Sequence, residues 1–481
     1  MLYFYANTAL VLNLLAFSLI PSHDWRDCAH AGAGDVAAQS LVMEIVMFLS
    51  CLSRFKTALF GWLAVIMLPN QAMAAVNAIN SGDTAWILTA TALVLLMTLP
   101  GLALFYAGLV QAKNVVSVLM HHFAIAALMS VLWVMAGYSL AFSGDGDWVG
   151  DLGKLFMTNV TVDAMHDSIP ESVFAAFQMT FAIITPALII GAYVERMKFA
   201  AILIFSAMWL LAVYAPVTHW VWGGGIMAGW GVMDFAGGIV VHATAGTAAV
   251  VCALVIGKRR VFPRSVQPPH SPILTMIGAS MLWVGWFGFN GGSALGAGSG
   301  AGMAILVTHI AAATASLVWM VIEWARFGRP SLIGIVTGMV AGLATVTPAS
   351  GYIGVPGGLI LGLVGGVACY IAVELVRVRM RIDDSLDVFA VHGVGGIIGS
   401  LLVAYLALPA FGGLGLADGT SAGGQFIVQL AAVAITVVWT MIASYVILKI
   451  AATLVGLRVD QQDEIEGLDL SQHGERGYHN S

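Results

Sequence analysis

Two histidines lie inside long apolar stretches of this sequence, in matching contexts. The segments Val-His-Ala-Thr-Ala-Gly around His242 and Val-His-Gly-Val-Gly-Gly around His392 share the pattern Val-His-x-x-x-Gly. In a helix, each glycine would follow its histidine by one turn, on a face where a second backbone can approach closely. Imidazole exchanges protons near neutral pH, and ionisable side chains at membrane depth tend to line a pathway. One such histidine is more often structural, so the repetition favours a functional pair.

The composition predicts a membrane protein. The 481 residues are 60% hydrophobic and 9% charged, whereas soluble domains contain about 25% charged residues. Apolar runs of roughly 20 residues, the length that crosses a bilayer, follow one another along the chain. They predict an all-α polytopic membrane protein with eleven transmembrane helices, near residues 84–109, 115–142, 171–194, 199–221, 235–257, 273–289, 302–325, 331–348, 354–376, 388–408 and 425–450.

Basic residues in the predicted loops indicate the orientation, because Lys and Arg accumulate in short cytoplasmic loops. Every second loop carries them, namely Lys113, Arg196, Lys198, Lys258, Arg259, Arg260, Arg264, Arg326, Arg329, Arg377, Arg379 and Arg381. The intervening loops hold only Lys154, and the loop 143–170 is rich in aspartate. The first helix then starts outside, and the tail after Lys449 is cytoplasmic. The basic residues form no patch that would indicate nucleic-acid binding.

An outer N-terminus requires export, and residues 43–74 have the pattern of a signal peptide. Arg54 and Lys56 precede a short apolar stretch, and a small-residue cleavage motif, Ala-Met-Ala, ends at Ala74. The mature chain would begin at the next residue. A signal peptide begins at its own methionine, so residues 1–42 are then an upstream mistranslation or an unusual extension. The alternative is a twelfth helix.

The two histidine helices also suggest an internal repeat. Asp234 precedes His242 in the fifth predicted helix, and Asp387 precedes His392 in the tenth. By the loop charges, these two helices cross the membrane in opposite directions, which is typical of an inverted-topology repeat with a site near the midplane. We therefore predict two inverted units of five helices, and an eleventh helix outside the repeat.

Common catalytic signals are absent from the sequence. The glycine-rich segments lack the Gly-Lys-Ser/Thr ending of a phosphate loop, and His-Glu-x-x-His does not occur. The four cysteines have no metal-ligand spacing. We expect no metal, no cofactor and no enzymatic activity. A metal-dependent polytopic membrane enzyme is an alternative, but it would need more His, Asp or Glu at ligand spacing within the helices.

Six longer motifs follow one another between roughly residues 80 and 480. They are Leu-Pro-Gly-Leu-Ala-Leu-Phe-Tyr ending at Tyr106, Gly-Ala-Tyr-Val-Glu-Arg ending at Arg196, Asp-Phe-Ala-Gly-Gly from Asp234, Gly-Trp-Phe-Gly-Phe-Asn ending at Asn290, Thr-Pro-Ala-Ser-Gly-Tyr ending at Tyr352, and Gly-Leu-Asp-Leu-Ser-Gln-His-Gly-Glu ending at Glu475. In this order they resemble the Amt/Mep/Rh ammonium transporter family, and specifically its bacterial Amt branch.

The resemblance implies a lipid-embedded homotrimer in a bacterial inner membrane, with one pore through each subunit. By motif match, the outer recruitment site and gate comprise Phe181, Trp222, Phe289 and Ser293, and the twin-histidine pore comprises His242 and His392. Without the resemblance, the tryptophan would be assigned to the membrane interface and the two phenylalanines to helix packing.

Asp234 falls near the implied recruitment site. It lies at the start of a helix, where a carboxylate caps backbone N–H groups, and it could instead attract a cation. We favour the structural role. Three further histidines, His121, His122 and His309, depart from the family pattern, and we predict no role for them.

The implied site residues suit a small cation that can lose its proton. Each aromatic face attracts ammonium by about 0.5–2 kcal/mol, and a serine hydroxyl accepts an N–H bond. An intact ion in a narrow apolar pore would cost on the order of 10 kcal/mol. We therefore expect recruitment of ammonium at the periplasmic face, deprotonation, and conduction of ammonia, with the proton, to the cytoplasm. An ammonium sensor with little flux is an alternative that would share every pore residue.

The chain ends in a polar segment. We expect an ammonium transporter membrane domain over residues 75–455 and a cytoplasmic regulatory tail over 456–481. The tail motif resembles the family segment that packs against a neighbouring subunit and helps to dock a PII-type signal protein, which implies such a partner. An added signalling domain would favour the sensor alternative, and this tail is too short for one.

Overall fold

The computed structural model describes residues 79–260, 262–263 and 268–478. The chain divides into two units after Val76, and the described residues belong to the second, Asn77–Ser481. The predicted extension 1–42 and the predicted signal peptide 43–74 lie outside the described residues.

Eleven helices in the described part of the chain are long and apolar enough to cross a membrane. They are Ser81–Leu109, Ala112–Phe142, Glu171–Tyr193, Phe199–Gly229, Gly238–Ile256, Pro272–Gly292, Ser299–Phe327, Leu332–Ala349, Val355–Arg379, Phe389–Leu406 and Ala422–Val455. The eleven predicted spans are therefore confirmed, and the fold is the expected all-α polytopic one with a five-plus-five inverted repeat and one additional helix.

Most spans consist of more than one helical element. The α-helices are α3 Ser81–Leu96, α4 Ala103–Leu109, α5 Val115–Leu132, α6 Tyr138–Phe142, α7 Glu171–Tyr193, α8 Phe199–Trp209, α9 Ala215–Trp222, α10 Ile226–Gly229, α11 Thr244–Ile256, α12 Pro272–Gly292, α13 Ser299–Phe327, α14 Leu332–Val346, α15 Val355–Glu374, α16 Val394–Leu406, α17 Ala422–Val455, α18 Gln461–Glu466 and α19 Leu468–His473. Strands β1 Met165–His166 and β2 Ile169–Pro170 form a small hairpin.

Six spans contain a π-helical segment, in which the backbone is wider than in an α-helix. These segments are Met97–Leu102, Trp133–Gly137, Leu210–Tyr214, Gly238–Ala243, Leu375–Arg379 and Phe389–Gly393. Short 3-10 turns occur at Ala112–Asn114, Leu155–Met157, Thr347–Ala349 and Pro409–Phe411. π-Helical turns are rare and occur frequently at functional sites, and His242 and His392 each lie in one.

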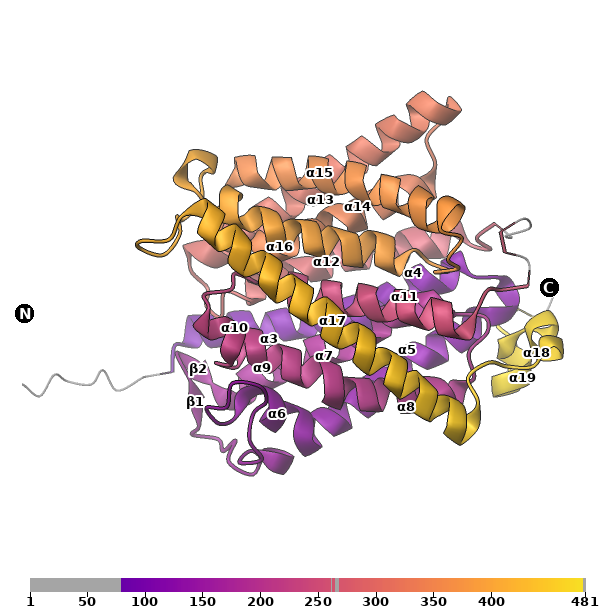
Figure 1. Ribbon diagram of the computed structural model, residues 1–481, viewed down its shortest axis with the longest axis horizontal. Helices are drawn as coiled ribbons and strands as arrows, with labels where there is room; N and C mark the ends of the chain where they lie inside the picture. Colours follow the sequence, from indigo (N-terminus) through magenta and orange to yellow (C-terminus); the bar gives the residue numbers. More distant parts are fainter. Residues whose placement is uncertain (1–78, 261, 264–267, 479–481) are drawn as a thin grey trace, which may run out of the picture. The chain divides into compact units, whose positions relative to one another are not determined.

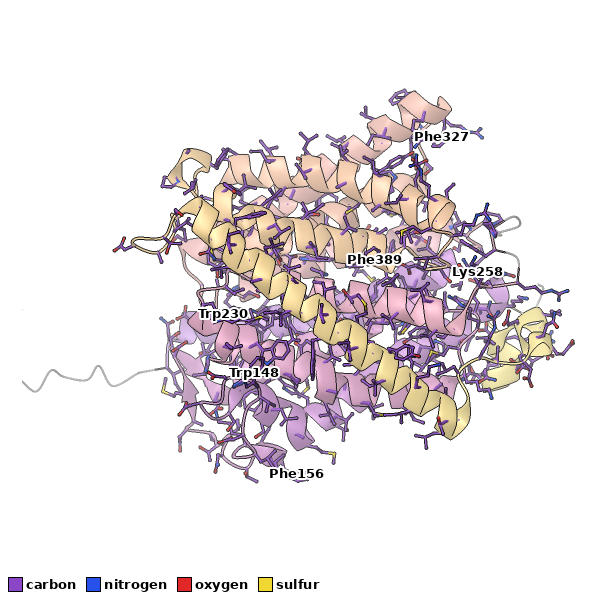
Figure 2. The ribbon with its side chains drawn as sticks, in the orientation of Figure 1. Trp148, Phe156, Trp230, Lys258, Phe327 and Phe389 are labelled. Carbon is purple, nitrogen blue, oxygen red and sulfur yellow. The ribbon has the colours of Figure 1, made fainter. Side chains whose placement is uncertain are left out.

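The helices run side by side between two ends of the bundle (Figure 1). The hairpin β1–β2 and α10 lie at one end, which we call the Trp222 end, and α18 and α19 lie at the opposite one, which we call the Lys113 end. Helix α17 crosses the bundle obliquely and packs against α8, α11 and α16. Figure 2 shows the side chain of Trp230 toward the Trp222 end and that of Lys258 toward the Lys113 end.

Glycines allow the two histidine helices to cross in close contact. A Cβ atom on Gly246 would lie 2.3 Å from the Cα of Gly393, and one on Gly396 would lie 2.5 Å from the Cβ of His242. No side chain fits in such a space, so glycine is required at both positions. The close backbone approach predicted from the Val-His-x-x-x-Gly pattern is therefore confirmed.

The aspartates that cap the two histidine helices are Asp234 and Asp384, whereas Asp234 and Asp387 were predicted as counterparts. Asp234 accepts hydrogen bonds from Ile239 and Val240, five and six residues further on, and Asp384 accepts one from Phe389, also five residues on. Each aspartate precedes its pore histidine by eight residues.

The prediction that Asp387 is the counterpart of Asp234 in the second half of the repeat is therefore wrong, because Asp384 has that position. Asp387 forms an ion pair with Arg377 instead, at 2.6 Å. An Asp followed closely by a Phe occurs before both histidines, but the hydrogen bonds depend on the distance from the aspartate to the start of the helix.

Candidate functional site

The two histidine rings meet in the interior of the bundle. The Nδ1 atoms of His242 and His392 are 3.2 Å apart, and the rings are stacked at 5.2 Å and 21°. Their exposed fractions are only 1% and 4%. A hydrogen bond between two Nδ1 atoms requires one of them to donate and the other to accept. The pair therefore shares one proton at this contact.

The outer ring nitrogen of the first histidine is available for a ligand. Nε2 of His242 is buried and has no hydrogen-bond partner among the described residues. A buried polar atom without a partner is unusual and calls for an explanation such as a bound molecule. A void of about 10 Å3 lies beside both histidines, lined also by Trp286, Phe289 and Val340. That is room for about one water-sized molecule.

Aromatic rings lead from the histidine pair toward the Trp222 end. The ring of Phe289 lies 6.1 Å from that of His242, and Phe181 and Phe289 lie 4.3 Å apart at an interplanar angle of 36°. Trp222 meets Phe181 edge to face at 5.9 Å and 88°. The two phenyl rings are 1% exposed, so they close the path between Trp222 and the histidines in this conformation.

A cavity of about 280 Å3 opens beyond the phenyl rings, at the Trp222 end. Trp222, Phe181 and Ser293 line it together, and Phe289 lies directly beneath in contact with Phe181. The hydroxyl of Ser293 donates to the carbonyl of Phe289 at 2.8 Å, so its lone pairs are free to accept from a bound molecule. The structure thus brings the four predicted recruitment and gate residues together.

Asp234 lies behind this cavity and faces its own backbone. Its carboxylate accepts from the N–H groups of Gly237, Gly238, Ile239 and Val240, and its carbonyl accepts from the indole N–H of Trp222 at 2.7 Å. Burial raises the pKa of this carboxyl, and the four N–H donors oppose that rise. Asp234 therefore caps the His242 helix and positions Trp222.

A larger cavity of about 570 Å3 lies on the other side of the pair, at the Lys113 end, and is bordered by His392. Three of the four acidic residues in its wall are paired with arginines, and the fourth, Glu323, accepts hydrogen bonds from Ser331. Glu195 meets Arg259 at 2.9 Å, Glu374 meets Arg326 at 2.7 Å, and Asp387 meets Arg377 at 2.6 Å. Each pair joins one carboxylate to one guanidinium, so these three carboxylates are neutralised in the cavity wall.

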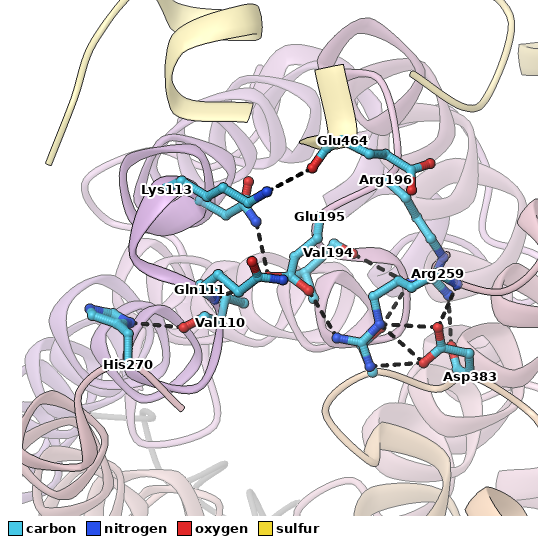
Figure 3. Close-up of polar contacts among 12 residues, drawn as sticks. Val110, Gln111, Lys113, Val194, Glu195, Arg196, Arg259, His270, Asp383 and Glu464 are labelled. Atoms are coloured by element: carbon cyan, nitrogen blue, oxygen red, sulfur yellow. Dashed lines mark hydrogen bonds and ion pairs between the residues drawn. The ribbon is translucent and has the colours of Figure 1, made fainter. Parts of the chain in front are cut away.

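A network of polar contacts joins the loops at the Lys113 end (Figure 3). Arg259 binds Asp383 at 2.9 Å as well as Glu195, and Arg196 donates to the Asp383 carbonyl at 2.7 Å. Burial alone would raise the pKa values of Glu195 and Asp383, but the guanidinium of Arg259 brings both below their usual values. Both carboxylates are therefore ionised near neutral pH.

The tail is attached to this network. Lys113 donates to the carbonyls of Glu464 and Ile465 at 2.9 and 2.7 Å, and the N–H of Leu468 donates to Asn114 at 2.8 Å. Asn114 in turn donates to Glu195 at 2.9 Å. In the described residues, α18 and α19 are thus held by contacts with loops of the same chain.

Three residues of the site were not predicted as such. Trp286 stacks on His242 at 5.5 Å and donates to Thr347 at 2.9 Å, while His166 and Gln178 line the cavity at the Trp222 end. Trp286 lies within a motif that carried the family resemblance, and Trp286 and Gln178 lie about one helical turn from Phe289 and Phe181. That spacing could have identified them, whereas nothing in the sequence places the loop residue His166.

The three histidines without a predicted role lie away from the pore. His121 faces Ser117, Phe199 and His473, and His122 contacts the Val118 carbonyl at 2.8 Å. His309 stacks on Trp283 at 5.1 Å on the exposed side of α12 and α13.

The chain is similar to proteins of a known family. A family model described as the Ammonium Transporter Family matches residues 85–478. Ammonium transporter Amt1 of Archaeoglobus fulgidus is 45% identical over 402 residues, which are 83% of this chain and 100% of that protein.

Solved structures also resemble the chain. Mep2 of Saccharomyces cerevisiae has a TM-score of 0.71 and 34% identity, over 79% of this chain and 91% of that chain. A structure named "Sensor Amt Protein" has a TM-score of 0.76 and 29% identity, over 82% of this chain and 98% of that chain. The family match covers almost all of the described residues.

Proposed function

Because this chain belongs to the ammonium transporter family, we propose that it recruits ammonium beside Trp222, deprotonates it, and conducts ammonia past His242 and His392 together with the proton. The observation that carries the proposal is the continuous series of ring contacts from Trp222 through Phe181 and Phe289 to the histidine pair. It joins a cavity at one end of the bundle to a cavity at the other.

Recruitment uses the cavity at the Trp222 end. The faces of Trp222 and Phe181 attract a cation by about 0.5–2 kcal/mol each, and the Ser293 oxygen accepts one of its N–H bonds, because the hydroxyl proton is already donated to Phe289. No carboxylate is among the described residues that line this cavity, and the carboxylate of Asp234 is occupied by backbone donors. The site therefore holds a cation weakly and releases it readily.

Deprotonation provides the selectivity over potassium. The pore beyond Phe289 has room for about one water-sized molecule, so an ion would enter without its hydration shell, at a cost on the order of 10 kcal/mol. Ammonium avoids this cost by giving up its proton, and neutral ammonia then fits between apolar walls. Potassium has no proton to give up.

The histidine pair carries the released proton. The free Nε2 of His242 accepts it, the Nδ1 proton passes across the 3.2 Å contact, and His392 delivers a proton to the cavity at the Lys113 end. Each imidazole gains one proton and loses another, so the transfer exchanges the protonated nitrogens of both rings. The rings then return to their first state before the next cycle.

The orientation in the membrane follows from the loop charges. We assign the Trp222 end to the periplasm and the Lys113 end to the cytoplasm of a bacterial inner membrane, because Lys and Arg accumulate in short cytoplasmic loops. The first helix then starts outside and the tail lies in the cytoplasm. We further propose a homotrimer, embedded in lipid, whose cytoplasmic face and tail bind a PII-type signal protein.

Electrical recording tests the transport proposal. Purified protein in liposomes should give a current when an ammonium gradient is applied and none with an equal potassium gradient. Liposomes without protein are the control. Net ammonia movement without the proton would give alkalinisation of the lumen but no current. This result would contradict the proton relay but not transport itself.

The same recording distinguishes the sensor alternative. A fold that resembles a structure named "Sensor Amt Protein" could bind ammonium with little flux. Ammonium binding measured by calorimetry, together with neither current nor alkalinisation in the liposomes, would overturn transport and favour the sensor.

A further inference from the structure

A histidine of the outer hairpin lies in the wall of the recruitment cavity. His166 is in β1, pairs with Ile169 of β2 across the turn, and lines the same cavity as Trp222, Phe181 and Ser293. Its ring stacks on Phe174 at 3.6 Å and 18°. Phe174 lies two turns before Phe181 on α7, so the stack continues the aromatic wall of the cavity toward its mouth.

The charged groups that face His166 are few. Asp167 lies 3.8 Å from its Nε2. Glu171 of α7 is held by Lys154 and by the hydroxyl of Tyr138, and Asp83 of α3 binds the neighbouring Ser168 at 2.7 Å. The residues that α9 and the segment after α12 contribute to the cavity wall, which include Trp222 and Ser293, are uncharged. His166 is therefore the one titratable side chain among the described residues that line this cavity.

We propose that His166 is a further residue of the recruitment site, and that its charge sets the apparent affinity for ammonium. As a neutral imidazole it completes the aromatic wall and offers a lone pair to an N–H group. As an imidazolium it is itself a cation against the same rings, so it repels ammonium and competes with it for their faces. This inference rests on the proposed function, because it concerns the same cavity.

The environment of His166 sets the pH at which this change occurs. Burial against Phe174 lowers the pKa of the ring below its usual value, although Asp167 and Glu171 act in the opposite direction. The ring is thus neutral at pH 7 and gains its proton under acid conditions. One added charge at a partly exposed site should weaken ammonium binding on the order of 3- to 10-fold.

The test is the ammonium concentration that gives half-maximal current, measured in proteoliposomes at outer pH 7.5 and 5. This concentration reports binding at the mouth, whereas the maximal current also follows the proton gradient. We expect a rise on the order of 3- to 10-fold for the parent between the two pH values. His166→Gln should show no such rise, and His166→Lys should be raised at both pH values.

A matched control is His270→Gln. His270 lies at the Lys113 end, where it contacts the Val110 carbonyl at 2.8 Å, and this variant should follow the parent. Size-exclusion profiles would establish that each variant is folded. If His166→Gln does not fold, His166→Lys tests the role of His166 independently.

The outcomes separate this inference from the proposed function. A parent that carries ammonium current with the same half-maximal concentration at both pH values, or a His166→Gln variant that keeps the parent's pH dependence, would overturn the role of His166 alone. A parent without ammonium transport at either pH would overturn the proposed function, and the inference with it.

Discussion

The contact between His242 and His392 defines what each ring can do. Because the two Nδ1 atoms are 3.2 Å apart, only one of them carries a proton, and the protonation of one ring dictates that of the other. Neither ring has a carboxylate among the hydrogen-bond partners that the described residues supply. A charged imidazole would therefore be poorly stabilised there, which favours rapid passage of a proton over its storage.

Replacement of the first histidine by a carboxylate should change the selectivity. In His242→Asp, the carboxylate stabilises an intact cation where the imidazole exchanges a proton. We expect ammonium current to persist and potassium current to appear, whereas the parent excludes potassium. Equal exclusion of potassium by parent and variant, both folded, would contradict deprotonation as the step that selects ammonium.

Trp222 provides a test of recruitment. Trp222→Leu keeps most of the apolar volume but removes the π face, which is expected to contribute about 0.5–2 kcal/mol to the capture of a cation. The half-maximal ammonium concentration should therefore rise by roughly 2- to 30-fold. Trp439→Leu, at an exposed tryptophan of α17, is the matched control and should behave as the parent. An unchanged Trp222→Leu variant would return Trp222 to an interfacial role.

The sequence identified the residue types of the pore better than their neighbours. The repeated Val-His-x-x-x-Gly pattern and the family motifs pointed to residues that the structure brings together, because their spacing within one helix is visible in the sequence. His166 and Asp384 were not predicted, and Asp387 was predicted in place of Asp384, since these roles depend on where a loop folds back and where a helix begins.

At the scale of the helices, the contact between His242 and His392 depends on two close approaches between helices and on two π-helical turns. Gly246 and Gly396 permit the approach of the histidine helices, and the π-helical turns Gly238–Ala243 and Phe389–Gly393 orient both rings toward each other. Each of the two π-helical turns begins shortly after a capping aspartate, which is Asp234 in one helix and Asp384 in the other. Each half of the repeat therefore presents its histidine by the same local construction, from opposite ends.

A single methyl group should disturb this crossing. In Gly246→Ala, the added Cβ would lie 2.3 Å from the Cα of Gly393, so the helices must separate, at a cost of about 1–3 kcal/mol. We expect a lower melting temperature and a reduced ammonium current. Gly423→Ala on α17, where an added Cβ meets no atom within 4 Å, is the control. A Gly246→Ala variant as stable and active as this control would contradict the tight crossing.

The spans themselves were predictable because a bilayer imposes one length and one composition on each of them. The π-helical segments were not, because they carry no distinct composition and arise from packing between helices. The fourth span was predicted to end near residue 221, close to the end of α9 at Trp222, whereas the short helix α10 extends it to Gly229.

At the scale of the whole molecule, the N-terminus gives a simple test. If residues 43–74 are a signal peptide, the mature membrane protein begins at Ala75, because the Ala-Met-Ala motif fits a signal peptidase site. N-terminal sequencing of protein purified from membranes should give Ala-Val-Asn. A retained Met1 or Met47 would show that the segment is not removed, and would favour a twelfth helix.

The void beside the two histidines decides how the pore behaves when no ammonium is present. It has room for about one water, and the stacked rings of Phe181 and Phe289 close the path beyond it. A continuous file of waters, which would conduct protons in either direction, does not fit. An energised membrane holds roughly 2.3 kcal/mol per elementary charge for each 100 mV. If the pore passes protons only together with ammonium, it draws on that potential only while ammonium is transported, and it does not discharge the membrane when ammonium is absent.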